Sequence, residues 1–477
     1  MAKVLFLQNI SYDYVGTMML SAELKQAGHQ CLVKTGHTIS AFRAIIEQER
    51  PDIIGFSLMS GLHLWANDIT AQIRAMNLPY RPFIIYGGPH PTFFPDILTK
   101  SQADAVCIGE GDGAIVDLAN CIANGGDPTT IANLHVKKGA EIVRNPVRPL
   151  VELDSLPFAD RTVYYGDRFF RDSPTKQFAA GRGCPYNCTF CYNKRIRDVY
   201  EKKGTFVRLR SPENVVAEIA EVRRKWGMRT VMFLDDTFGL QKPWLLALAE
   251  RYKKEVGLPF MCKIRANTVD EEMVAALKDA GCYAVCFAIE TANEDLRERV
   301  LRKRVTDDNI RGTAKLLRKH KVKFLTYNMV GIPTQTTQDI LDTIDLNVEI
   351  GTSYPWCSIF SPYPGTELGE FCIQEGYLDR SFNPDDLSTS FHSTVPIATK
   401  DAKTINNLHK LFQLAVLVPW LRPLVKKLAK FPPNPCFTLI FAFVYFVNYV
   451  RSERLSFFRT VRLALDNAKE MLGSKRG

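Results

Sequence analysis

The chain has 477 residues, 46% of them hydrophobic and 23% charged, which is typical of a globular protein with two or three domains. This composition excludes a disordered chain. Twelve scattered cysteines and no secretory pattern at the N-terminus argue against a disulfide-stapled extracellular protein, so we expect a cytoplasmic one.

Residues 1–125 alternate short apolar runs with amphipathic stretches. This alternation predicts βαβ units and a doubly wound, Rossmann-like parallel sheet. The expected strands are 4–7, 31–33, 53–58, 83–86 and 105–108. The expected helices are 17–26, 41–49, 64–76, 92–98 and 113–123.

Ligands of such sheets bind at the carboxyl ends of the strands, where this chain has several small and polar residues. Glycines there suit the close approach of a large flat ligand, although ordinary βα turns explain them equally well. The candidate ligand-binding residues are Asn9, Ser57, Gly87, Gly88, Gly109, Glu110 and Gly111.

Residues 126–177 are rich in Pro and Asp and show little periodicity, which predicts a linker. The alternation resumes over 178–385, where six βα repeats are expected. The expected strands are 178–180, 230–234, 260–264, 284–289, 323–330 and 356–360. The expected helices are 212–226, 244–256, 270–280, 306–320 and 337–350.

A short cysteine run carries the most specific chemical signal. Cys184, Cys188 and Cys191 have the spacing C-x3-C-x2-C. Three thiolates this close suit three irons of a [4Fe–4S] cluster, and no fourth cysteine follows at matching spacing, which leaves one iron open. A zinc knuckle is the alternative, but zinc knuckles close with a fourth Cys or His nearby.

Residues 386–477 depart from the βα pattern and hold most of the charge asymmetry. From 401 onward there are 13 Lys and Arg against 4 Asp and Glu, which accounts for nine of the ten net positive charges. The aromatic-rich apolar run 436–450 is flanked by cations, an arrangement that suits a helix lying in an anionic membrane surface. The alternative is a helical cap that packs over the βα repeats of residues 178–385. The flanking cations are Lys426, Lys427, Lys430, Arg451, Arg454, Arg459 and Arg462.

The cysteine run resembles the signature of the radical S-adenosylmethionine (SAM) enzymes, C-x3-C-x-aromatic-C, with Phe190 at the aromatic position and Tyr192 after it. The resemblance implies a partial (β/α)6 barrel and a [4Fe–4S] cluster whose open iron chelates SAM. It also implies that an electron from an external donor splits SAM to a 5′-deoxyadenosyl radical, which removes a hydrogen atom from an unactivated carbon.

Gly-Gly-Pro-His-Pro-Thr (87–92) and Gly-Glu-Gly-Asp (109–112), followed by the cysteine run, resemble the cobalamin-dependent radical SAM enzymes over roughly residues 1–385. The motif D-x-H-x-x-G, whose His ligates cobalt in many B12 proteins, is absent. The resemblance therefore implies base-off cobalamin without a protein His ligand, and His63 and His90 are expected to be loop residues.

The expected carboxyl ends of the barrel strands supply the candidate SAM-binding residues. Asp235 and Asp236 suit the SAM ammonium group, and Arg265 suits its carboxylate because guanidinium binds carboxylates in a bidentate manner. Glu290 matches the G-I-E-S-G element of the family, with Ala288 and Ala292 where Gly is usual, and the resemblance places it at the ribose hydroxyls. Radical abstraction needs no general base, so no catalytic side chain is assigned beyond the cofactors. Tyr327, on the fifth expected strand, is kept as a candidate.

These features predict a methyltransferase that uses SAM twice: cobalamin takes a methyl group from one SAM, and the substrate radical formed with a second SAM collects it. We expect a hydrophobic small-molecule substrate, peripheral contact with the inner face of the membrane and no nucleic acid. The alternatives are a cobalamin-dependent radical cyclase or ring-rearranging enzyme, a methylthiotransferase and a non-catalytic cobalamin or redox sensor. A methylthiotransferase needs a second cluster, and the only cysteines before the run are Cys31, Cys107 and Cys121.

Overall fold

The computed structural model describes residues 1–388, 390–392, 394–453 and 461. These residues fall into two compact units, each described here by itself. The first contains Met1–Ser173 and Ile196–Arg208, and the second contains Pro174–Arg195 and the described residues from Leu209 onward.

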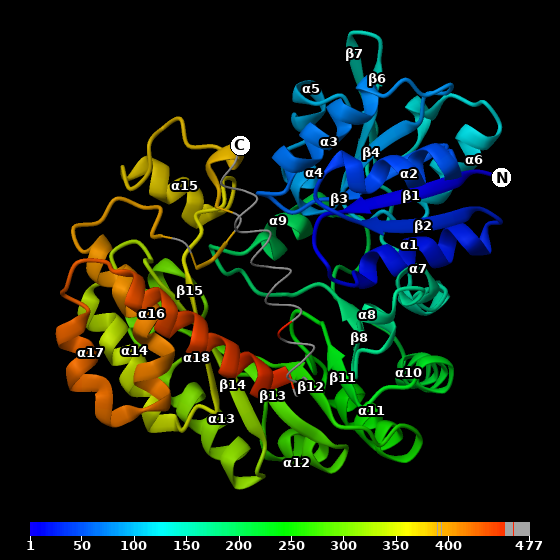
Figure 1. Cartoon of the computed structure of the whole chain (residues 1–477). Helices are drawn as coiled ribbons and strands as arrows, with labels where there is room; N and C mark the ends of the chain where they lie inside the picture. Colours follow the sequence, from blue (N-terminus) through cyan, green and yellow to red (C-terminus); the bar gives the residue numbers. More distant parts are fainter. Residues whose placement is uncertain (389, 393, 454–460, 462–477) are drawn as a thin grey trace. The chain divides into compact units, whose positions relative to one another are not determined.

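The first unit is built on a seven-stranded sheet with the order β2-β1-β3-β4-β5-β6-β7 (Figure 1). Strands β1 to β5 run parallel and follow the predicted apolar runs. Their bounds are β1 (Lys3–Gln8), β2 (Gln30–Thr35), β3 (Ile53–Ser57), β4 (Phe83–Gly87) and β5 (Ala105–Cys107).

Helices cover both faces of this sheet, so the predicted doubly wound fold is confirmed. Phe42 and Ile46 pack on one face and Leu24 and Leu118 on the other, all fully buried. Burying a side chain of this size stabilises the fold by about 1.5–3 kcal/mol. The helices are α1 (Val15–Gln26), α2 (Ile39–Glu49), α3 (His63–Ala75), α4 (Pro89–Phe93), α5 (Ile97–Lys100) and α6 (Ala114–Ala123).

Two parts of the first unit differ from the sequence prediction. The helix expected over 92–98 is divided into α4 and α5, because Pro95 lies between them and has no backbone N–H to donate. The segment expected to be a linker contributes β6 (Leu134–Lys138) and β7 (Glu141–Arg144), which extend the sheet in antiparallel fashion. Its other elements are η1 (Pro128–Thr130), η2 (Leu153–Ser155), α7 (Thr162–Tyr165) and α8 (Arg168–Arg171).

The second unit is built on a six-stranded parallel sheet with the order β15-β14-β13-β12-β11-β8. Each strand overlaps a predicted one, although β8 shares only Phe178 with the predicted strand 178–180. The strands are β8 (Thr175–Phe178), β11 (Thr230–Phe233), β12 (Phe260–Lys263), β13 (Cys282–Glu290), β14 (Lys323–Val330) and β15 (Tyr354–Ile359).

The helices of the second unit follow the strands in the predicted alternation. Their apolar faces form the largest core of the chain, around side chains such as Val216, Val274 and Phe324. The helices are α10 (Pro212–Trp226), α11 (Lys242–Glu255), α12 (Glu271–Asp279), α13 (Asp307–Lys319), α14 (Thr337–Ile350) and α15 (Glu367–Gln374). Shorter elements are β9 (Gly181–Arg182), α9 (Tyr192–Val199), β10 (Arg208–Leu209), η3 (Leu296–Val300) and η4 (Pro384–Asp386).

The C-terminal helices pack on the second sheet. α16 (Ala402–Leu417) contacts α14 and β15, and α18 (Pro435–Glu453) contacts α16 and β15. The Asn448 amide in α18 donates a 2.9 Å hydrogen bond to the Pro355 carbonyl, so this apolar helix is fastened to the strands. η5 (Pro419–Leu421) and α17 (Arg422–Leu428) lie between them in the chain. The expected basic flank at Arg454, Arg459 and Arg462 lies outside the described residues.

Candidate functional site

The three cysteines lie on one loop of the second unit, between β9 and α9, and all are partly exposed. The loop is fastened at Thr189, between Cys188 and Cys191. The Thr189 hydroxyl donates to the Val300 carbonyl at 2.6 Å, and the Thr189 amide donates to the Leu301 carbonyl at 3.1 Å. Thr189 thus ties the part of the loop that carries Cys188 and Cys191 to the segment that follows β13.

Burial governs the protonation of the thiols. It raises the pKa of Cys184 above its ordinary value and the pKa of Cys191 to about 11, and the Cys188 thiol nearby raises both further. Because metals bind thiolates, cluster assembly must displace these protons. As the side chains stand, no three His, Cys, Asp or Glu residues in the described ranges are grouped closely enough to hold a metal ion. The fit to a cluster therefore rests on the donor set, three neighbouring thiols on one loop.

The two adjacent aspartates after β11 have different surroundings. Asp235 is buried, and its carboxylate accepts a 3.0 Å hydrogen bond from the Ala180 amide, just before the cysteine loop. Asp236 is exposed and lies close enough to Cys184 to raise the pKa of that thiol. Asp236 therefore remains the candidate for the SAM ammonium group, whereas Asp235 supports the backbone.

The buried Asp235 carboxyl gives a testable pH dependence. Burial raises its pKa to about 6, above the ordinary value of 3.8, so the folded protein holds this proton more tightly than the unfolded chain. Stability should therefore decrease as pH rises from about 4 to about 6 and stay level above that range. Urea unfolding of the cluster-free protein measures this. Between pH 5 and pH 7, we expect the free energy of unfolding of wild type to fall by about 1 kcal/mol more than that of Asp235→Asn. Equal pH slopes for the two proteins would contradict this role.

Arg265 follows β12 and has a buried nitrogen to offer. Its Nε donates to the Asn267 side chain at 2.9 Å, and its guanidinium lies 3.7 Å from the centre of the Tyr186 ring. Its Nη1 is 3.9 Å from the Cys188 sulfur. Its buried Nη2 has no hydrogen-bond partner among the described residues. A carboxylate bound beside the cysteine loop would satisfy this nitrogen, which fits the role expected from the sequence.

Glu290 ends β13 in a conformation that side chains rarely adopt, with φ of +67°. Its carboxylate forms a buried 2.7 Å ion pair with the Lys303 ammonium. Backbone strain of this kind persists where the surrounding structure holds it, and often at functional sites. Sequence analysis missed Lys303, although it stands in the basic run Arg302-Lys303-Arg304 shortly after the family element.

The remaining candidates of the second unit have protein partners. Phe190 packs in an apolar cluster with Leu301 and Phe360, which suits support of the cysteine loop. The Tyr192 hydroxyl donates to the Pro364 carbonyl at 3.1 Å. Tyr327 is half-buried in the inner apolar cluster of the sheet. Thr237, which sequence analysis missed, lies with its hydroxyl 3.7 Å from the Cys184 sulfur.

In the first unit, the protein's own packing explains the glycines at the ends of β4 and β5. Gly88 has φ of +93°, and a Cβ there would lie 2.9 Å from the Leu58 amide nitrogen. Gly109 has φ of +77°, and a Cβ there would meet the Tyr200 hydroxyl at 2.1 Å. Both positions therefore require glycine.

Glu110 is paired within the first unit. Its carboxylate forms an ion pair with Arg208, and its amide donates to the Tyr200 hydroxyl at 2.5 Å. We infer that Glu110 fixes the shape of the 109–111 loop. Tyr200 and Arg208 were missed because nothing in the sequence pattern links them to the strand ends.

The other strand-end residues of the first unit are accessible to a ligand. Ser57 is exposed, and Asn9 and Gly111 are partly exposed. By contrast, the rings of His63 and His90 are buried and stacked with centroids 3.9 Å apart. The expectation that both are loop residues was wrong, because His63 begins α3 and His90 lies within α4.

Two protein-family models match the chain, the radical SAM superfamily over residues 179–346 and the B12 binding domain over residues 11–119. The chain belongs to the cobalamin-dependent radical SAM enzymes. The first match covers the cysteine loop, Arg265 and Glu290 of this enzyme. The second covers the strand ends that carry Gly88 and Gly109.

Proteins similar to the enzyme include methyltransferases and cyclases. An uncharacterized methyltransferase of Pyrococcus horikoshii is 28% identical over 81% of this chain and 83% of its own. The anaerobic magnesium-protoporphyrin IX monomethyl ester cyclase of Rubrivivax gelatinosus is 21% identical over 67% of this chain and 58% of its own. The solved structure of the methyltransferase TsrM from Kitasatospora setae, with tryptophan and a SAM analogue bound, has a TM-score of 0.64, 17% identity, and coverage of 79% of this chain and 76% of its own. That last likeness concerns the fold.

The enzyme therefore uses a [4Fe–4S] cluster, SAM and cobalamin. When bound, the cluster and SAM would supply the radical, and cobalamin would supply the chemistry of its cobalt. The protein's own contribution is to position groups: Thr189 holds the cysteine loop, Arg265 offers an unsatisfied donor, and Gly88 and Gly109 let the strand-end loops pack against Leu58 and Tyr200.

Proposed function

We propose that this enzyme transfers a methyl group to an unactivated carbon of a hydrophobic small molecule. A group of apolar and aromatic side chains on one face of the second sheet supports the hydrophobic substrate, because such side chains gain most from contact with an apolar ligand. The members of this cluster are Met232, Met261, Tyr283, Ala284, Cys286, Leu325, Tyr327, Tyr354 and Trp356.

The proposal is tested with methyl-labelled SAM, a one-electron reductant and added hydroxocobalamin under anaerobic conditions, with isoprenoid, polyketide and tetrapyrrole candidates as acceptors. We expect the label to move to the corrinoid and then to a carbon of one acceptor. Formation of 5′-deoxyadenosine with bound corrinoid that never takes label would favour the cyclase or rearrangement chemistry instead. No cleavage of SAM by the reduced protein would favour a sensor.

The cysteines of the first unit argue against a methylthiotransferase. Cys31 lies on β2 and Cys107 on β5, both buried, and Cys121 lies on α6. These three thus come from three different elements, whereas the cysteines of the cluster motif share one loop. A second cluster would therefore need a rearrangement of the sheet.

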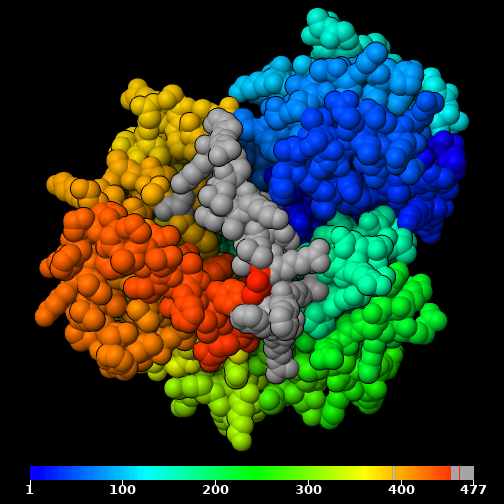
Figure 2. Space-filling view, viewed as in Figure 1, coloured from blue at the N-terminus to red at the C-terminus, as the bar shows by residue number. Residues whose placement is uncertain are grey.

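We also propose that the C-terminal helices touch an anionic membrane surface. By length and composition, one helix of the described chain, Pro435–Ser452, is apolar enough to cross a membrane. Its contacts with β15 support a peripheral position instead. On its outer side Leu439 and Phe443 are about 70% exposed, and exposed cations lie on the preceding segment, an arrangement typical of interfacial helices. These cations are Lys426, Lys427 and Lys430. α17 and α18 form part of the surface in Figure 2 (orange and red).

Vesicle flotation tests this contact. We expect wild-type enzyme to float with vesicles that contain phosphatidylglycerol and to be released by salt, because screening weakens the attraction of its cations. Leu439→Glu with Phe443→Glu should abolish flotation. Leu64→Glu, which charges an apolar residue of α3 that is 49% exposed, should not. Failure of the wild-type enzyme to float would contradict the contact.

A further inference from the structure

The segment between β13 and α13 connects two parts of the candidate site. It starts at Thr291, forms the π-helical turn η3 and ends at Thr306. Arg302 and Arg304 adopt positive φ of 46° and 51°, so the chain bends sharply after η3. Irregular turns of this kind cost free energy, and other contacts must hold them in place.

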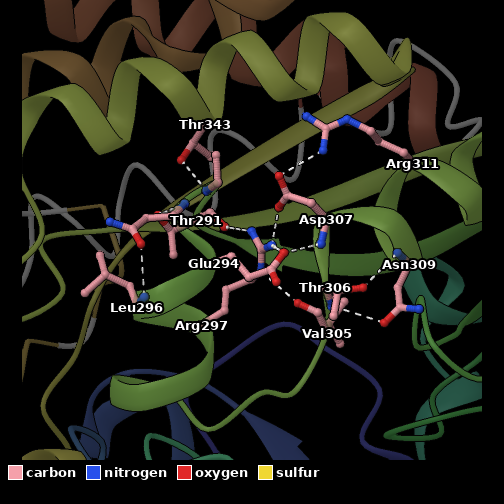
Figure 3. Close-up of polar contacts among 12 residues, drawn as sticks. Thr291, Glu294, Leu296, Arg297, Val305, Thr306, Asp307, Asn309, Arg311 and Thr343 are labelled. Carbon is pink, nitrogen blue, oxygen red and sulfur yellow. Dashed lines mark hydrogen bonds and ion pairs between the residues drawn. The ribbon is translucent and has the colours of Figure 1, made fainter.

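One buried guanidinium, that of Arg297, binds both ends of this segment (Figure 3). Its Nη1 donates to the Thr291 carbonyl at 2.6 Å, and its Nε donates to the Val305 carbonyl at 2.9 Å. Its Nη2 is paired with Asp307 at the start of α13 and lies 3.4 Å from the Glu294 carboxylate. The fork of donors of an arginine thus staples the beginning of the segment to its end.

The middle of the stapled segment carries its contacts with the site. The Val300 and Leu301 carbonyls accept the two hydrogen bonds from Thr189 in the cysteine loop. Lys303, whose amide donates to the Arg297 carbonyl at 2.8 Å, brings its ammonium to Glu290. One segment therefore determines where the cysteine loop and the Glu290 carboxylate lie.

We propose that Arg297 is a positioning residue that couples the cysteine loop to the Glu290–Lys303 pair, and so sets the geometry in which SAM binds. The proposal rests on the function proposed above only in naming SAM as the ligand. Arg297 touches neither Glu290 nor the cysteines, and it acts through the backbone of residues 300–303. Lysine keeps the charge but cannot bind Thr291, Val305 and Asp307 together.

Hydrogen exchange on the reduced, cluster-free protein tests the coupling without any turnover. The Thr189 amide, bonded to Leu301, is the reporter. In Arg297→Lys we expect exchange across 188–191 to become about tenfold faster, because the segment that protects this amide opens more often. Arg299→Ala is the matched control. It also removes a cation from this turn, but the Arg299 side chain is 79% exposed. Its exchange should match that of wild type.

Thr189→Val provides a second test that spares the buried staple. It removes the hydroxyl that bonds Val300 and keeps the size of the side chain. In equilibrium dialysis with reconstituted protein, we expect both Arg297→Lys and Thr189→Val to raise the Kd for SAM by about tenfold with unchanged iron content, a loss of the size that removal of an outer-shell partner causes.

Wild-type exchange at 188–191 together with wild-type SAM affinity in both variants would overturn the coupling. A lower melting temperature of Arg297→Lys without a local change would overturn it as well, because Arg297 would then be structural only. Neither result would bear on methyl transfer, which is measured by label from SAM.

Discussion

Replacing Cys191 by alanine should abolish SAM cleavage and reduce the iron content of the reconstituted enzyme. We expect the three thiols of one loop to be the protein donor set for the cluster, so removal of one leaves two. The loss should exceed about a hundredfold, the upper end of what removal of an outer-shell partner of a metal ligand costs. Iron analysis and chromatography of 5′-deoxyadenosine measure it.

Cys436→Ala is the matched control, because Cys436 is exposed on α18 and has no place in the candidate site. Its iron content and SAM cleavage should equal those of wild type. Full SAM cleavage by Cys191→Ala would mean that the cysteine loop is not the cluster site.

Arg265→Lys should weaken SAM binding without removing the cluster. The guanidinium has a buried Nη2 without a protein partner and is held by Asn267 and the Tyr186 ring, and a lysine reproduces neither the fork nor the stacking. Losing one partner of a buried charged pair costs 2–5 kcal/mol, so we expect the Kd for SAM to rise by about 30-fold or more. Equilibrium dialysis of the reconstituted protein measures this.

Arg251→Lys on α11 controls for the substitution itself, because Arg251 forms only surface ion pairs. Its Kd should stay at the wild-type value. If Arg265→Lys binds SAM as tightly as wild type and retains its iron, then Arg265 does not bind the SAM carboxylate.

Much of the fold could be predicted because hydrophobic periodicity reports burial directly. The strand predicted at 323–330 and the helices predicted at 212–226 and 337–350 coincide with β14, α10 and α14. The hairpin of β6 and β7 was missed because its strands are short and flanked by Pro and Asp rather than by a regular apolar pattern.

The candidate site was predictable where a motif carries the chemistry, and less so where partners lie far apart in sequence. The spacing of Cys184, Cys188 and Cys191 identified the loop. The sequence could not show that Asp235 supports the Ala180 backbone while Asp236 stays exposed. Likewise, Arg208 and Glu110 are 98 positions apart, and only the fold brings them together.

The most direct test of the account is to ask whether one polypeptide binds corrinoid and cleaves SAM. The protein is reconstituted anaerobically with iron, sulfide and hydroxocobalamin, desalted, examined by visible spectroscopy, and incubated with SAM and reductant. We predict retained corrinoid and formation of 5′-deoxyadenosine in the same preparation. Deoxyadenosine formation without retained corrinoid would contradict the role given to the first unit, and with it the proposed methyl transfer.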